Sequence, residues 1–233
     1  MRRRVDETWR PTADDPDEPS PRRNGDAPPS PTEAIVRAAP YERLFERRIV
    51  FLRGALEETT ADDLIAQLLA LDHDSDDTVT VYIDSPGGNT YGMFALYDVI
   101  QSMRSKVDTR CVGLAASAGG FLLATGTGVR SATANATIML HQPWGGIGRS
   151  TAADLAKHAG QFVATRRRME AILAERTGQP LERVERDIDR DLWLTAAEAR
   201  DYGAVDEVIG TTPILAQVRP QVDPSGAGRG SVA

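Results

Sequence analysis

Residues 78–120 read TVTVYIDSPGGNTYGMFALYDVIQSMRSKVDTRCVGLAASAGG and contain the pattern that decides the fold. The alternation of β-branched and apolar residues over 78–83 predicts a strand, and the spacing of apolar residues over 91–103 predicts a helix. A second strand is expected over 107–114, and a second helix begins near Ser117. Strand, helix and strand in succession predict parallel strands with helices packed on the faces of the sheet.

The same alternation continues on both sides of this stretch. Strands are expected at 48–52, 138–140 and 205–209, and helices from residue 60, over 152–176 and over 195–203. Thr60 followed by Asp63 resembles a capping box. We expect the helix that it opens to bury one apolar face, made by Leu64, Ile65, Leu68 and Leu69. The predicted fold class is therefore α/β, built from repeated β-α units with one long helix.

Composition excludes several classes of protein. The chain has 233 residues, 41% of them apolar, which is enough for a sizeable core. Its 27 Lys and Arg against 34 Asp and Glu give a net charge of -7, which provides no basic face for nucleic acid or anionic lipid. The single cysteine, Cys111, cannot form an internal disulfide or a thiolate metal cage, so we expect a cytoplasmic protein without a metal site.

The two ends of the chain differ in composition from its middle. Residues 1–36 are rich in proline and charge and poor in apolar residues, which predicts a disordered arm or a propeptide. Residues 213–233 are expected to form a disordered tail, which leaves 37–212 as the folded domain. The first residues lack the apolar segment of a signal peptide. Residues 111–129 carry too many glycines and hydroxyl groups for a membrane span, so we expect neither export nor a membrane.

Three loops at strand ends carry the candidate chemistry, because ligands of such folds bind at the carboxyl ends of the strands. Residues 85–88 (SPGG) leave the backbone bare, and residues 113–120 place Ser117 at a helix start where the N–H of Ala118 faces any oxyanion. Residues 141–146 begin with His141. Each loop also has a simple structural explanation: a turn, a helix N-cap and a hydrogen-bonded histidine.

Together these loops supply a nucleophile, an imidazole base and backbone donors, which are the parts that acyl transfer requires. A carboxylate must also orient the imidazole. The acidic run at 185–191 offers four candidates, and spacing alone does not choose among them: Glu185, Asp187, Asp189 and Asp191. The ordinary interpretation of such a run is a solvated helix face.

These motifs resemble those of ClpP, the family of proteolytic subunits of the ATP-dependent Clp protease. The resemblance runs in collinear order over about residues 41–210. Its motifs are Tyr41–Leu52, Tyr82–Gly88, Ala115–Gly119, Met139–Pro143 with Gly145 and Gly146, Thr177–Gln179, Asp189–Asp191, Ala199 and Tyr202–Gly203.

The resemblance implies a role for each matching residue. Ser117 would be the nucleophile, His141 the general base and acid, and Asp191 the carboxylate that orients the imidazole. Gly88 and Ala118 would supply the two N–H groups of the oxyanion hole. The order Ser, His, Asp also differs from the Ser, Asp, His order of α/β-hydrolases.

The resemblance further implies a ClpP/crotonase-like fold in which the long helix over 152–176 is a handle between rings. Two stacked rings of seven subunits would form a tetradecamer around a chamber, and Asp189 and Arg190 would make charge pairs between the rings. An ATPase unfoldase of the Clp/Hsp100 class would deliver unfolded proteins. The chain has no phosphate-binding loop of its own, so the unfoldase would use the ATP and the subunit needs no cofactor.

One group of positions departs from the family pattern. The unfoldase usually docks in a pocket lined by aromatic and apolar side chains, but the matching positions here are Thr80, Ser102 and Ser131, with only Tyr82 kept. We therefore hypothesise that this subunit docks the unfoldase weakly and shares its particle with a different ClpP-like subunit.

Other functions compete with the serine peptidase. A catalytically silent ring subunit would not need an intact Ser117, His141 and Asp191. An acyl-CoA enzyme of the crotonase type would use carboxylates and has no need of a Ser–His pair. A Ser–Lys peptidase would need a lysine base, but neither Lys106 nor Lys157 lies in a recognisable motif.

Overall fold

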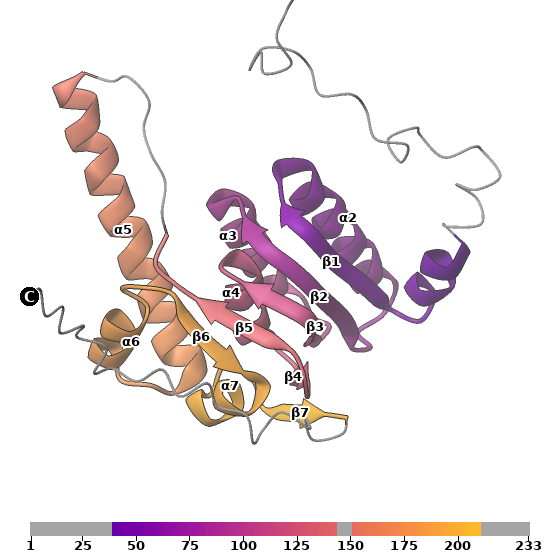
Figure 1. Ribbon diagram of the computed structural model, residues 1–233. Coiled ribbons are helices and arrows are strands. Elements are labelled where there is room, and N and C mark those ends of the chain that lie inside the picture. Colours follow the sequence, from indigo (N-terminus) through magenta and orange to yellow (C-terminus); the bar gives the residue numbers. More distant parts are fainter. Residues whose placement is uncertain (1–38, 144–150, 211–233) are drawn as a thin grey trace, which may run out of the picture. The chain divides into compact units, whose positions relative to one another are not determined.

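The computed structural model describes residues 39–143 and 151–210 (Figure 1). The arm expected at 1–36, the tail expected at 213–233 and the motif residues Gly145 and Gly146 lie outside the described residues. The chain divides into two units, residues 1–40 and 41–233, and the sheet and its helices belong to the second.

A seven-stranded sheet forms the centre of the described part (Figure 1). Five strands lie side by side in the order β1-β2-β3-β4-β7, and each neighbouring pair is parallel. They are β1 (Ile49–Leu56), β2 (Val79–Gly88), β3 (Val107–Ala116), β4 (Arg130–Thr133) and β7 (Glu207–Ile209). The carboxyl half of β3 pairs instead with β5 (Thr137–Leu140), which pairs antiparallel with β6 (Leu192–Thr195).

Helices α2 (Glu58–Asp74), α3 (Thr90–Ser102) and α4 (Ala118–Ala124) cover one face of this sheet, and lie behind the strands in Figure 1. The core between them is apolar, and its largest fully buried side chains include Leu52, Ile83, Leu96, Phe121 and Leu123. The predicted α/β fold of repeated β-α units with a long helix is confirmed.

The remaining helices are α5 (Ala152–Thr177), α6 (Leu181–Asp187) and α7 (Ala196–Tyr202). α7 begins, as expected, next to Thr195, and it has a capping box: the Thr195 side chain accepts from the Glu198 N–H, and the Glu198 side chain accepts from the Thr195 N–H. Among the described residues, no helix combines the length and the apolar character that a membrane crossing requires.

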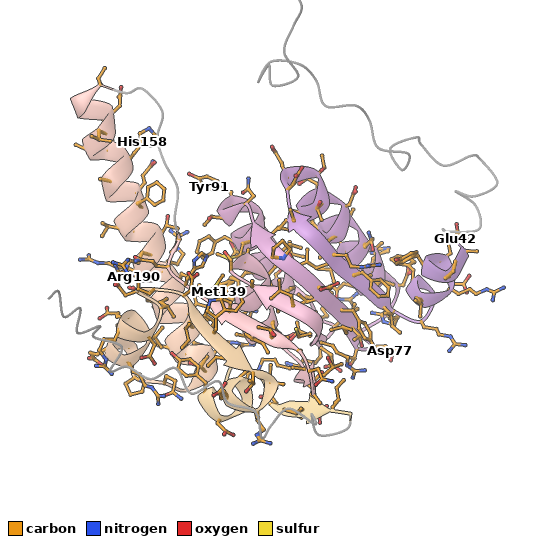
Figure 2. All side chains as sticks on the ribbon, viewed as in Figure 1. Glu42, Asp77, Tyr91, Met139, His158 and Arg190 are labelled. Carbon is orange, nitrogen blue, oxygen red and sulfur yellow. The ribbon has the colours of Figure 1, made fainter. Side chains whose placement is uncertain are left out.

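The long helix α5 has two unlike halves. Its C-terminal half is anchored in the core by Met169 and Leu173, which are 4% and 0% exposed. Its N-terminal half, residues 154–164, is exposed in every described position, including Leu155 at 54% and His158 (Figure 2). Packing on its own domain therefore accounts for only the C-terminal half of this helix.

Three local expectations were wrong. α2 begins at Glu58 after Glu57, which makes no side-chain cap, so Thr60 and Asp63 lie inside the first turns instead of opening the helix. Leu69 is 49% exposed and Leu71 is buried instead, because the buried stripe of α2 runs through Ala61, Leu64, Leu68 and Leu71 at helical spacing.

The other two errors concern strands. Residues 84–88 were expected to end the second strand, but β2 continues through Gly88, and Gly87 and Gly88 pair with Ala55 and Leu56 of β1. The pairing of β6 with β5 also adds an antiparallel edge to a sheet that was expected to be parallel throughout. β6 begins at Leu192, directly after the acidic run of residues 185–191.

Candidate active site

Ser117 stands in the turn between β3 and α4. Its φ and ψ are 55° and -119°, a conformation that non-glycine residues rarely adopt. Its N–H donates to the Met139 carbonyl at 2.9 Å, which holds the turn against β5. Ser117 is the N-cap residue of α4, but its hydroxyl makes no capping bond to the helix, so capping does not account for the hydroxyl. The hydroxyl is therefore available to the neighbouring imidazole.

His141 follows the last residue of β5, the strand that pairs with the end of β3. Ala116 pairs with Met139, so the residues that follow each strand emerge at the same edge of the sheet. The His141 Nε2 lies 2.7 Å from the Ser117 Oγ, and the imidazole is 11% exposed. This is the distance of a good hydrogen bond between a hydroxyl and a ring nitrogen.

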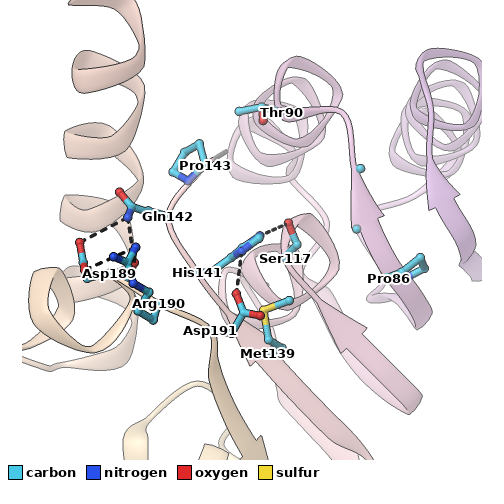
Figure 3. A pocket seen from close by; sticks show the side chains of 12 residues that line it. Pro86, Thr90, Ser117, Met139, His141, Gln142, Pro143, Asp189, Arg190 and Asp191 are labelled. Carbon is cyan, nitrogen blue, oxygen red and sulfur yellow. Dashed lines mark hydrogen bonds and ion pairs between the residues drawn. The ribbon is translucent and has the colours of Figure 1, made fainter. Parts of the chain in front are cut away.

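Asp191 completes the chain of hydrogen bonds, as Figure 3 shows. Its Oδ1 lies 3.2 Å from the His141 Nδ1. The antiparallel register brings the two residues together, because Leu140 pairs with Leu192 and the residues just outside that pair then face one another. The structure therefore brings together Ser117, His141 and Asp191, each of which lies next to the end of a different strand.

The other carboxylates of the acidic run have different partners. Asp187 pairs with Arg183 one helical turn away, at 3.2 Å. The Asp189 Oδ1 accepts from the Gln142 side chain at 3.3 Å and lies 3.6 Å from the Arg166 guanidinium. No bond joins Asp187, Glu185 or Asp189 to His141 within the described part of the chain.

Gly87 and Gly88 form one wall beside Ser117. A Cβ atom on Gly87 would lie 2.6 Å from the Ser117 Cβ and 2.9 Å from the Ala118 nitrogen, so the two segments touch through backbone alone. The Leu56 carbonyl accepts from the Asn89 N–H at 2.6 Å, and successive amides of a strand alternate in direction. The N–H of Gly88 therefore points away from β1.

Ala118 is the first residue of α4, and the N–H of a first helical residue has no intrahelical acceptor. The amides of Gly88 and Ala118 thus come from the two backbone segments that meet beside the Ser117 hydroxyl. Such a pair of donors is the arrangement that stabilises an oxyanion.

A cleft of about 840 Å³ opens over these groups (Figure 3). Besides the predicted residues it is lined by Pro86, Gly87, Thr90, Met139, Gln142 and Pro143. The sequence interpretation had not singled out Thr90, Met139, Gln142 or Gly87 as site residues. The position of Gln142 directly after His141 could have marked it as a site residue. Its hydrogen bond to the Asp189 carbonyl could not have been predicted, because that bond depends on the tertiary fold.

Asp189 and Arg190 also line this cleft. The Arg190 side chain is 89% exposed, and its guanidinium donates only to the Asp189 carbonyl, at 3.3 Å, among the described residues (Figures 2 and 3). The pairing of these residues between rings stays a prediction. No group of three or more potential metal ligands occurs in the described segments.

A family model described as Clp protease matches residues 33–212. The chain belongs to the Clp protease family. It is 45% identical over 172 residues to the ATP-dependent Clp protease proteolytic subunit 1 of Thermobifida fusca (strain YX), an alignment that covers 73% of this chain and 78% of the relative. The serine, histidine and aspartate described above therefore lie in the cleft of a serine peptidase of the Clp protease family.

Proposed function

We propose that the chain is an endopeptidase subunit in which Ser117 is the nucleophile, His141 the general base and acid, and Asp191 the residue that orients the imidazole. The observation that carries this proposal is the continuous hydrogen-bonded chain from the Ser117 Oγ through both ring nitrogens of His141 to the Asp191 carboxylate. A hydroxyl, an imidazole and a carboxylate in that order are the parts of a serine peptidase.

The reaction follows from this geometry. His141 Nε2 takes the Ser117 proton as the Oγ attacks the scissile carbonyl carbon. The carbonyl π electrons move to its oxygen, which accepts hydrogen bonds from the amides of Gly88 and Ala118. The imidazolium then protonates the leaving amine, the C–N bond breaks, and an acyl ester on Ser117 remains. Water attacks this ester with His141 again as base, which releases the acid and restores the hydroxyl.

Asp191 acts on the imidazole alone. Its carboxylate accepts a hydrogen bond from the Nδ1–H, which keeps the proton on Nδ1 and leaves the Nε2 lone pair directed at Ser117. It also stabilises the imidazolium that forms during attack. The Asp191 side chain is 54% exposed, so solvent reaches one side of this pair in the single chain.

We further propose that the substrates are unfolded polypeptides that enter a closed chamber. Beside Ser117 the cleft is lined by Gly87 and Gly88, which have no side chains. Such a wall gives little discrimination between substrates, so selectivity must come from restricted access. Two stacked rings of seven subunits in the cytoplasm, supplied by a Clp ATPase, provide that restriction.

The exposed Arg190 is proposed to make a charge pair with the opposite ring. Arg190→Ala should yield single rings with little peptidase activity, measured by sedimentation and peptide cleavage. Arg200→Ala is a matched control, because Arg200 is also an exposed arginine paired with the adjacent aspartate, but in α7. Stable, active double rings of Arg190→Ala would contradict this part of the proposal.

The face that would receive the ATPase is partly occupied by polar groups. The Arg110 guanidinium lies 5.3 Å from the centre of the Tyr82 ring and donates to its hydroxyl at 3.0 Å. Arg110 also donates to the Ser131 hydroxyl at 3.3 Å. We propose that this subunit docks the ATPase weakly and joins a second kind of ClpP-like subunit; tight binding of the ATPase by rings of this chain alone would refute that.

Labelling with a fluorophosphonate tests the catalytic assignment directly. The reagent should label wild-type protein at Ser117, and Ser117→Ala should lose both the label and peptide hydrolysis while it keeps its assembly state. Asp191→Asn should lower kcat by about 10⁴-fold. Asp187→Asn is the matched control, since Asp187 pairs with Arg183 and should leave kcat within about twofold.

Two outcomes would contradict the proposal. Unlabelled but correctly assembled protein would favour an architectural subunit or an acyl-CoA enzyme. A larger loss from Asp187→Asn than from Asp191→Asn would mean that another carboxylate orients His141.

A further inference from the structure

One buried hydroxyl lies behind the strand segment that borders Ser117. Ser85 of β2 is 0% exposed. Its Oγ donates to the Gly54 carbonyl of β1 at 2.6 Å and accepts from the Gly87 N–H at 3.1 Å. The side chain therefore joins β1 to the Gly87 peptide, which touches Ser117.

This bridge stands where the sheet is irregular on both sides of β2. The register between β1 and β2 shifts between Arg53 and Ala55, and that between β2 and β3 shifts between Ile83 and Ser85. Such shifts interrupt the ladder of backbone bonds. The Gly54 carbonyl and the Gly87 N–H lie at this interruption and need hydrogen-bond partners. The Ser85 hydroxyl satisfies both, because it donates to the carbonyl and accepts from the N–H.

On its other side, β2 loses its neighbour at the same residue. Ser85 and Ala115 form the last pair between β2 and β3, and β3 then runs on to Ser117. Among the described residues, the segment of Gly87 and Gly88 is thus hydrogen-bonded to the sheet along β1 and through Ser85, and not to β3. Anything that holds this segment in place also holds the Gly88 amide.

We propose that Ser85 is a positioning residue for transition-state stabilisation, acting through Gly87 on the Gly88 amide. The inference rests on the proposed function, in which that amide binds the oxyanion. The Ser85 hydroxyl occupies the amide of Gly87 and prevents rotation of the peptide plane that carries it. The Gly88 N–H belongs to the next peptide plane, so Ser85 fixes the chain before Gly87 while the pairing of Gly88 with Leu56 fixes it afterwards, and together they hold the Gly88 amide toward the reacting carbonyl.

A positioning role and a purely structural role differ in what they change. Loss of the Ser85 hydroxyl should lower kcat and leave KM nearly unchanged, because the amide contacts the oxygen strongly only in the transition state. A misplacement of about 1 Å in an active site can cost about a hundredfold. We expect Ser85→Ala to lower kcat between about tenfold and a hundredfold, with KM within about twofold.

The matched control is Thr109→Val. Thr109 is 1% exposed in the neighbouring strand β3, and its hydroxyl donates to the Leu123 carbonyl at 2.7 Å. Both variants remove one buried hydroxyl that bonds to a backbone carbonyl, but only Ser85 is linked to the Gly87 peptide. Thr109→Val should lower the midpoint of urea unfolding and leave kcat within about twofold.

A second readout isolates the oxyanion site. A peptide aldehyde adds to a serine hydroxyl, and the oxygen of the tetrahedral adduct occupies the place of the oxyanion. Ser85→Ala should weaken inhibition by the aldehyde by the same factor as kcat, and inhibition by the corresponding uncleaved peptide amide by less than about twofold. If Ser85→Ala is insoluble, Ser85→Cys is measured instead, since it fills nearly the same space but bonds only weakly.

The results separate the two claims. A Ser85 variant with wild-type kcat and aldehyde affinity overturns the positioning role while Ser117 labelling still supports the proposed function. Equal loss of kcat in Thr109→Val also overturns it, because the effect would then be general. Hydrolysis that persists in Ser117→Ala overturns the proposed function, and this inference with it.

Discussion

The contact between Gly87 and Ser117 makes Gly87→Ala the sharpest perturbation of the site. A Cβ atom on Gly87 would lie 2.6 Å from the Ser117 Cβ and 2.7 Å from the Ala116 carbonyl oxygen. Carbon atoms pack at about 3.5 Å, so the two backbone segments must separate by nearly 1 Å. Both neighbouring atoms belong to backbone or to a Cβ, so no flexible side chain can move aside.

The expected loss can be worked from that displacement. Separation by about 1 Å pulls the Gly88 and Ala118 amides apart, and a shift of this size costs about a hundredfold in kcat, or about 2.7 kcal/mol of transition-state stabilisation. Gly87 also has a φ of 94°, where an alanine adds about 1–2 kcal/mol of backbone strain to the folded state.

Steady-state hydrolysis of a fluorogenic peptide measures the first effect, and urea unfolding measures the second. Gly210→Ala is a matched control, because Gly210 has a φ of 93° and a Cβ there would have no neighbour within 4 Å among the described residues. Gly210→Ala should therefore lower the free energy of unfolding through backbone strain and leave kcat unchanged. A kcat of Gly87→Ala within about threefold of wild type would refute the reasoning.

Three further predictions concern Ser117, Cys111 and Arg130. Because Ser117 has a φ of 55°, Ser117→Gly should be more stable than Ser117→Ala by about 1 kcal/mol in urea unfolding although both are inactive; equal stability would contradict strain at this turn. Burial, with a smaller effect of the Asp84 charge, raises the pKa of Cys111 to about 12, so the thiol should resist iodoacetamide at pH 8 until the protein unfolds. Fast labelling of the native protein would disprove the burial of this thiol. Because its pKa is raised in the folded state, the contribution of the neutral thiol to stability is complete below about pH 9 and is lost as the pH rises toward 12. The Arg130 guanidinium donates to the carbonyls of Ala124, Arg176 and Gly203 and to the Asp206 carboxylate, so Arg130→Met should lower the free energy of unfolding by about 3 kcal/mol, and a loss below about 1 kcal/mol would contradict this role.

The sequence pattern was sufficient to predict those helices and strands whose formation depends mainly on their own residues. The alternation over 78–83 and the expected start of the last helix at Thr195 both describe short-range geometry, and the structure has a strand and a helix there. The start of α2 shows the limit of this reasoning. Thr60 and Asp63 have the composition of a cap, but the preceding residues also accept helical geometry and the helix begins at Glu58.

Other features could not be predicted from the sequence pattern, because they depend on pairing between strands or residues that are distant in the sequence. Pro86, Gly87 and Gly88 have the composition of a turn, yet β2 runs through all three, and Gly87 and Gly88 pair with Ala55 and Leu56 of β1. The choice of His141's partner among four carboxylates depends on the register of β6 against β5, which places Asp191 opposite His141. The partnership of Ser85 with Gly54 joins residues 31 positions apart, and no local signal marks it.

The change of neighbours along β3 has a consequence for how this chain can vary in length. β3 pairs with β4 through Cys111 and with β5 from Leu114, and Ser117 follows directly. Side chains alternate along a strand, so one inserted or deleted residue between these two pairings would reverse the direction of the serine. Natural variants and engineered insertions should therefore accumulate in surface loops such as the one after α2, and spare the short segment between Cys111 and Ser117.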